Sequence, residues 1–307
     1  MSKISSVSFL GSENKEQKNR KNIKGAIGAS IAGSVAPTVS LPVGLLAVRN
    51  LTKPSQELTK DQVTIVNDAA QKTLSEVTKL SKKGVKIIDC NGKSSFFSEL
   101  LPEWMLNMIS PIDATANGKN AFFFGDGSKR ELLAFELQGI DKNSVCVNKD
   151  KLPLATFHEM GHAFNFNNSK FWKSMQKVRS PLMIAGSLMC LLPAFTKEHK
   201  AKEGEELTRK QKFVNGLRKA SPFLAVASFV PMVAEESMAT IRGNKWAKEV
   251  FKDAPELAKK VAKSNKWGLV SYVVTALAAG FGTWVAKKVK DNSDAKKAKK
   301  SLAAHQG

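Results

Sequence analysis

The segment His158-Glu159-Met160-Gly161-His162 constrains this chain most, because it holds two of the four histidines in 307 residues and spaces them four apart. Residues i and i+4 lie one above the other on the same face of an α-helix, so the two imidazoles can converge on one metal ion. Glu159 follows the first histidine and points into the same site. The spacing therefore predicts a helix whose inner face binds a metal.

A catalytic zinc site takes three protein ligands and leaves one position for water, so two histidines are not enough. The next histidine, His199, lies far along the chain in a charged loop. The three cysteines form no C-x-x-C pair, which indicates neither a disulfide framework nor a cysteine-rich zinc site. Two adjacent acids, Glu235 and Glu236, end an apolar run. Metal coordination would offset the cost of burying a carboxylate there. The solvated first turn of a helix is the alternative interpretation of this pair.

The motif and these acids resemble the gluzincin clan of zinc metallopeptidases, in which H-E-x-x-H is joined to a downstream helix whose glutamate is the third zinc ligand. The segment Glu236-Ser237-Met238-Ala239-Thr240-Ile241-Arg242 is similar to the E-x-x-A-[ST]-x-R form of bacterial membrane-bound neutral zinc metallopeptidases. In those proteins, and in prenyl-protein-type membrane peptidases, H-E-x-G-H-A precedes a hydrophobic hairpin and the glutamate helix follows it. The same order is present here, and the resemblance covers roughly residues 144–245.

The resemblance implies zinc-dependent hydrolysis of peptide bonds on a zincin-like fold. His158, His162 and Glu236 would hold Zn²⁺. Glu159 would take the proton of the zinc-bound water as general base.

Supporting residues are also implied. Thr240 occupies the position where many gluzincins have an aspartate that orients a zinc-bound histidine, and its hydroxyl could accept that hydrogen bond more weakly. Glu235 is the neighbour of the ligand. Arg242 is a candidate for stabilising the transition state. His199 and Tyr272 are weaker candidates for the same role.

The net charge of +21 comes mostly from lysine and predicts an anionic partner. The lysines are densest beside apolar runs, which favours membrane lipid. A nucleic-acid partner is not expected, because neither an aromatic-rich basic stripe nor a zinc-finger spacing is present. The other expected partner is a peptide or protein substrate, and the oligomeric state is left open.

Four apolar segments could meet a membrane. Residues 267–286 have Trp267 and Trp284 near their two ends and lysines on both flanks, which is typical of a transmembrane helix. Residues 25–48 are long enough to span but rich in small residues, so an interfacial segment is the alternative. The runs 181–195 and 222–234 are shorter than a span and could be packed helices instead. Because Glu236 must lie on the same side as His158, both of these runs cross a membrane or neither does.

These patterns predict an α+β fold with a small sheet, an active-site helix and several apolar helices. Strands are expected at 85–90, 120–124, 131–137 and 144–148, with the second and third joined as a hairpin through residues 125–127. The predicted domains are a disordered basic N-terminus (1–24), the apolar segment (25–48), a metallopeptidase domain (49–266) that includes the runs 181–195 and 222–234, the transmembrane helix (267–286) and a disordered lysine-rich tail (287–307).

We therefore expect a membrane-associated zinc metallopeptidase that is multi-pass or anchored at its C-terminal end. One alternative is an inactive scaffold or adaptor that keeps the fold, for which Glu236 would be turned away from the histidines or no pocket would lie above them. Another is a basic peripheral protein that binds anionic lipid, for which the apolar runs would be packed in a soluble core.

Overall fold

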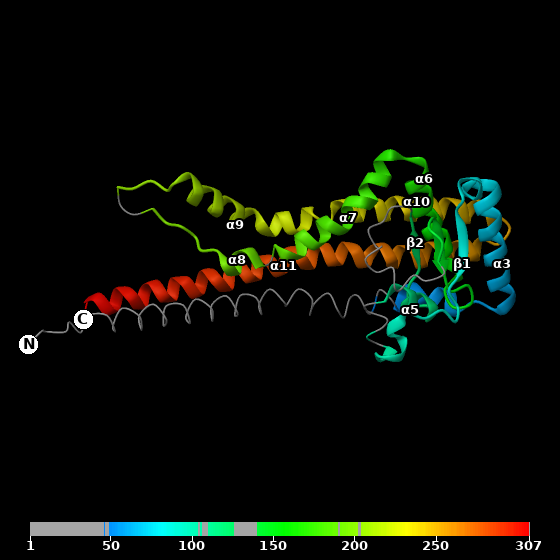
Figure 1. Cartoon of the computed structure of the whole chain (residues 1–307), viewed down its shortest axis with the longest axis horizontal. Coiled ribbons are helices and arrows are strands. Elements are labelled where there is room, and N and C mark those ends of the chain that lie inside the picture. The colour runs from blue at the N-terminus through cyan, green and yellow to red at the C-terminus, as the bar shows by residue number, and fades with distance from the viewer. Residues whose placement is uncertain are drawn as a thin grey trace, which may run out of the picture. The chain divides into compact units, whose positions relative to one another are not determined.

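A computed structural model describes residues 46, 49–103, 105, 110–125, 140–189, 191–201 and 204–306 (Figure 1). The described chain is mostly helical with one small sheet, which is compatible with the α+β class. It divides into two units. The motif unit comprises Pro42–Pro181 and Val230–Val274, and the apolar unit comprises Leu182–Phe229 and Thr275–Gly307 with Met1–Leu41. The predicted segments 1–24 and 25–48 lie outside the described residues, apart from residue 46.

The motif unit begins with helix α3 (Lys60–Lys72), as its sequence predicts. The Thr59 side chain accepts a hydrogen bond from the backbone N–H of Gln62, and the Gln62 side chain accepts one from the backbone of Thr59. This reciprocal cap satisfies two amide donors that a helix start leaves free. The helix continues into a π-helical turn (Thr73–Val77) and a 3-10 turn (Leu80–Lys83), and Gly84 ends it with a φ of 76°.

The sheet has three strands in the order β1-β3-β2. Strand β1 (Lys86–Asp89) runs parallel to β3 (Ser144–Val147), and β2 (Phe122–Phe124) runs antiparallel to β3. All four residues of β3, which falls within the strand predicted at 144–148, are buried. The hairpin partner predicted for β2, residues 131–137, lies outside the described residues.

Shorter elements complete this side of the motif unit. They are a 3-10 turn (Phe96–Glu99), helix α5 (Pro111–Ala116) and a 3-10 turn (Pro153–Ala155) that leads into the motif helix. Of the predicted helix 96–109, the 3-10 turn and helical residues 103 and 105 are described.

Helix α6 (Thr156–Asn168) carries the histidine motif and packs between β3 and helix α10 (Val230–Val250) in the core of the motif unit (Figure 1). Two glycines let α6 and α10 approach closely. A methyl group on Gly161 would overlap the backbone of Ala239, and one on Gly243 would overlap the backbone of Phe157. The close approach brings side chains of α10 directly against the histidines of α6.

The apolar unit is formed by the end of α7 (Lys170–Leu188), α8 (Leu191–Phe195), α9 (Arg209–Ala227) and the later part of α11 (Pro255–Gln306). Among the described residues, three helical segments are long and apolar enough to cross a membrane, by length and composition: Lys170–Phe195, Arg209–Val250 and Pro255–Ser301. The apolar runs 181–195 and 222–234 are parts of these longer helical segments.

Large apolar side chains on these helices are exposed, with Phe223 at 74% and Phe195 at 72%. The apolar unit has a buried charge of its own. Arg218 donates hydrogen bonds to the backbone carbonyls of Pro193 and Thr196 and pairs with Asp291 at 2.5 Å. This arginine therefore ties α9 to the end of α8 and to α11.

The structure differs from the domain prediction in two places. Residues 182–229 group with Thr275–Gly307 rather than with the motif unit, and the Arg218–Asp291 pair is one contact that joins them. The tail from residue 287 is helical through Gln306 instead of disordered. Alanine and lysine favour helix, and the pairs Lys287–Asp291 (3.1 Å) and Lys290–Asp294 (2.8 Å) add contacts four residues apart.

Candidate metal centre

Helix α6 places the two motif histidines side by side, as their spacing predicts. The Nε2 atoms of His158 and His162 are 3.0 Å apart, and the ring planes are nearly perpendicular at 87°. Both side chains are largely buried, with 12% of His158 and 6% of His162 exposed. The pair therefore faces the protein interior rather than solvent, which does not fit an ordinary surface pair.

Helix α10 brings Glu236 against both histidines. Its Oε2 atom lies 3.0 Å from His158 Nε2 and 3.3 Å from His162 Nε2. The Glu236 side chain is 2% exposed, so it is not part of a solvated helix start. The residue predicted as third ligand thus lies in contact with the two predicted ligands on α6.

The three facing atoms form a triangle whose sides measure 3.0–3.3 Å. Ligand atoms about 2.0–2.1 Å from a tetrahedral zinc ion lie about 3.3–3.4 Å from one another. The triangle therefore needs to open by only a few tenths of an ångström to accept an ion of that size.

The opposite side of each imidazole is held by a second side chain. His162 Nδ1 lies 2.7 Å and 2.9 Å from the two oxygens of Glu235, and His158 Nδ1 lies 3.3 Å from the Thr240 hydroxyl. A carboxylate only accepts hydrogen bonds, so His162 carries a proton on Nδ1, which leaves Nε2 as the nitrogen that a metal could take. The donor set of two imidazoles and one carboxylate with these supports fits zinc.

A polar network surrounds Glu235, and the sequence analysis did not predict it. Asn165 donates to Glu235 Oε1 at 3.2 Å, and Gln176 donates to the same oxygen at 2.6 Å. Arg179 Nη1 donates to Glu235 Oε2 at 2.6 Å and to Glu236 Oε1 at 3.1 Å. Gln176 and Arg179 belong to α7, three residues apart on one helical face, and Arg179 is the last charged residue before an apolar run.

Glu159 is 6% exposed, and one of its carboxylate oxygens lies within 4.8 Å of ligand atoms of both motif histidines. No hydrogen-bond partner of its carboxylate is found among the described residues. Burial raises the pKa of the Glu159 carboxyl, although the two imidazoles oppose this shift. Burial alone would lower the pKa of His162, but Glu235 and Glu236 outweigh it and raise that pKa well above its ordinary value. The cluster therefore has a strong preference for positive charge.

Among the described residues, the structure places Arg242 against Phe164 rather than against Glu236 or the motif histidines, and its support of the transition state stays a prediction. Its guanidinium lies over the Phe164 ring, 4.5 Å from the ring centroid. Six residues separate Arg242 from Glu236, which turns a helix by about 600° and places the two side chains on different faces.

The two weaker candidates lie in different places. His199 belongs to the apolar unit, where its backbone N–H and C=O bond to the Asn215 side chain. Tyr272 belongs to the motif unit and is within electrostatic reach of Glu236 and Arg179.

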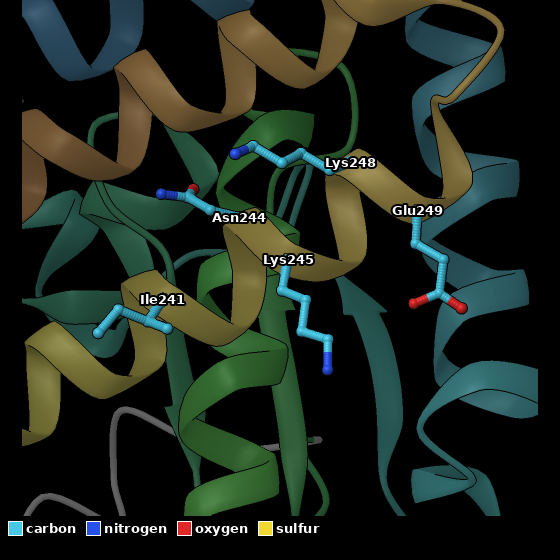
Figure 2. A pocket seen from close by; sticks show the side chains of 5 residues that line it. All are labelled: Ile241, Asn244, Lys245, Lys248 and Glu249. Atoms are coloured by element: carbon cyan, nitrogen blue, oxygen red, sulfur yellow. The ribbon is translucent and has the colours of Figure 1, made fainter.

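An open groove of about 600 Å³ runs along the outer face of α10 (Figure 2). Its lining residues recur at helical spacing on that face: Ile241, Asn244, Lys245, Lys248 and Glu249. None of the side chains at the metal centre lines this groove. It therefore contributes nothing to the chemistry of the centre.

The chain was compared with family models, with curated proteins and with solved structures, and none of them matches it. Its chemistry must therefore be inferred from its own residues and their geometry.

Proposed function

We propose that this chain is a zinc-dependent metallopeptidase that hydrolyses peptide bonds at or near a membrane. The observation that carries the proposal is the convergence of His158 Nε2, His162 Nε2 and Glu236 Oε2 within 3.0–3.3 Å, from two helices. A carboxylate without a hydrogen-bond partner among the described residues, Glu159, lies beside them. An inactive scaffold would not need Glu236 turned toward both histidines.

In this proposal His158, His162 and Glu236 hold the metal. Zinc bound there would supply Lewis-acid polarisation of the peptide carbonyl and of a water molecule. Glu159 accepts the proton from the attacking water at its carboxylate and delivers it to the leaving nitrogen. Glu235 holds the proton of His162 on Nδ1, and Thr240 supports His158 in the same way.

The membrane location is supported by three long uncharged runs, each bordered by a charged residue. Arg179 precedes the uncharged run 180–196, Glu235 follows the uncharged run 220–234, and Lys266 precedes the uncharged run 267–286. Two of these residues, Arg179 and Glu235, form an ion pair at 2.6 Å beside the metal centre. Residues of the proposed metal centre thus directly follow or precede uncharged runs in the sequence, which supports a peptidase that meets membrane-associated polypeptides.

A matched pair of variants tests the chemistry. The full chain is purified in detergent, loaded with zinc and assayed for casein hydrolysis. Glu159→Gln should reduce the rate by about 10²–10⁴-fold, because the general base is lost, while the zinc content stays at the wild-type level. Glu249→Gln makes the same change on the outer face of α10 and should leave the rate unchanged.

The proposal fails if the wild type does not cleave casein after zinc loading. It also fails if Glu159→Gln retains the wild-type rate. Removal of the metal with a chelator should abolish cleavage, and zinc should restore it.

A further inference from the structure

Arg179 connects the two adjacent glutamates through a single nitrogen. Its Nη1 atom donates to Glu235 Oε2 at 2.6 Å and to Glu236 Oε1 at 3.1 Å. The two glutamate side chains are 0% and 2% exposed, and the Arg179 side chain is 21% exposed. Charge-assisted hydrogen bonds at such lengths in a buried place are strong.

This contact separates the roles of the two oxygens of Glu236. Oε1 accepts from Arg179, whereas Oε2 faces His158 and His162. A carboxylate held in this way offers one oxygen to a metal and keeps the other turned away. Without the arginine, the carboxylate could rotate and offer both oxygens.

Arg179 Nη1 also contacts Glu235, the carboxylate that holds His162 through its Nδ1 atom. Glu235 Oε2 accepts from Arg179 at 2.6 Å and lies 2.7 Å from His162 Nδ1. Arg179 thereby restricts the carboxylate that fixes the orientation of His162. One residue of α7 thus controls a predicted ligand on α10 and the support of a predicted ligand on α6.

The balance of buried charges also supports a role for Arg179 at the centre. Glu159, Glu235 and Glu236 are buried together, and among the described lysines and arginines Arg179 is the one that forms ion pairs with this group. The guanidinium and one divalent cation together would balance the three carboxylates. Buried charges that are not balanced are costly.

We propose that Arg179 is a positioning residue that makes Glu236 a one-oxygen metal ligand and so keeps the centre four-coordinate. This inference rests on the proposed zinc site. It adds a residue of α7 to the centre, beside the histidine motif on α6 and the glutamate on α10.

Three variants of the full chain in detergent test this role. Arg179→Gln removes the charge and both contacts. Arg179→Lys keeps the charge but reaches less far and ends in a compact ammonium, which cannot take the place of Nη1 between both carboxylates. Lys177→Gln is the control, because it removes the same charge from an exposed position two residues earlier on α7.

Two properties are measured on each variant. The zinc dissociation constant is obtained by competition with a chelator. The visible absorption of the Co²⁺-substituted protein reports coordination number, because four-coordinate Co²⁺ absorbs more strongly than five-coordinate Co²⁺. Circular dichroism and thermal unfolding of the metal-free proteins establish that each variant is folded.

Arg179→Gln should raise the zinc dissociation constant by about 10–100-fold and weaken the Co²⁺ bands. Arg179→Lys should keep the fold and still show the weakened bands, so it carries the test if the glutamine variant does not fold. Lys177→Gln should match the wild type in both measurements.

The inference is overturned if Arg179→Lys shows the wild-type Co²⁺ spectrum, because charge alone would then suffice. It is also overturned if both Arg179 variants bind zinc within about threefold of the wild type. A wild type that binds neither metal would instead contradict the proposed zinc site itself, so the two failures can be told apart.

Discussion

The motif unit and the apolar unit place their charged and apolar side chains in opposite ways. The motif unit buries three glutamates, two histidines and part of an arginine around one point, next to a core of apolar residues that includes Phe157 and Val145. Among its described residues, the apolar unit buries the cation of two ion pairs, Arg218–Asp291 and Lys290–Asp294, and exposes phenylalanines along its helices.

The difference indicates which surroundings each unit requires. Burying so many ionisable groups is favourable only when they are paired with one another and with a cation, which supports the proposed metal site in the motif unit. Exposing many large apolar side chains in water is unfavourable in an isolated chain, which supports the proposed membrane location of the apolar unit.

The largest expected effect concerns the apolar unit. Phe223→Asp places a charge on an exposed apolar face, which costs about 2.5–3.5 kcal/mol if that face lies in a membrane centre. Phe171→Asp is the control, because Phe171 is 61% exposed but precedes the uncharged run. The fraction that stays in membranes after an alkaline wash should fall for Phe223→Asp and not for Phe171→Asp. Equal retention of both would mean that α9 does not lie in lipid.

The next effect compares two helical glycines. Gly161→Ala should destabilise the motif unit by about 1–3 kcal/mol, because the new methyl group would overlap the backbone of Ala239. Gly216 of α9 has no atom near the position of a Cβ, so Gly216→Ala should stabilise its helix by about 1 kcal/mol. Thermal unfolding measures both, and a stabilised Gly161→Ala would disprove the tight packing of α6 against α10.

A smaller effect is expected at the hydroxyl behind His158. Thr240→Val keeps the shape but removes the 3.3 Å contact to His158 Nδ1, so zinc should bind about tenfold more weakly. Thr240→Ser should retain most of the affinity. An unchanged dissociation constant in the valine variant would show that this contact does not support the ligand.

The smallest effect is expected for Arg242→Gln. The side chain lies over Phe164 rather than beside Glu236, so its loss should cost about 0.5–1 kcal/mol of stability and leave zinc affinity within about threefold. Thermal unfolding and chelator competition check the two parts. Loss of zinc binding in Arg242→Gln would show that Arg242 does support the metal centre.

The sequence predicted the parts of the fold and of the site that depend on local spacing. The i, i+4 histidines follow from the helical period of 3.6 residues and the strand around Cys146 from the strand period of 2, and the structure has both. An adjacent pair of acids after an apolar run is unusual, which indicated Glu235 and Glu236, and the resemblance to the E-x-x-A-[ST]-x-R form indicated Glu236 within that pair.

What the sequence did not predict depends on contacts between distant segments. No spacing rule relates Arg179 to Glu235, 56 residues later, because their contact depends on how α7 packs beside α10. The position of Arg242 over Phe164 does not follow from the motif either, because a motif gives residue order but not the helical face. The tail is helical because its many lysines and alanines favour helix, although a lysine-rich composition is also typical of disorder.

The central claim is that His158, His162 and Glu236 together bind zinc, and zinc stoichiometry tests it most directly. The full chain is equilibrated with zinc, freed of unbound metal and analysed for zinc per chain, with Glu236→Ala and the exposed Glu249→Ala as a matched pair on α10. We predict one zinc per chain in the wild type and in Glu249→Ala, and loss of bound zinc in Glu236→Ala. A wild type without zinc, or equal zinc in Glu236→Ala, would contradict the claim.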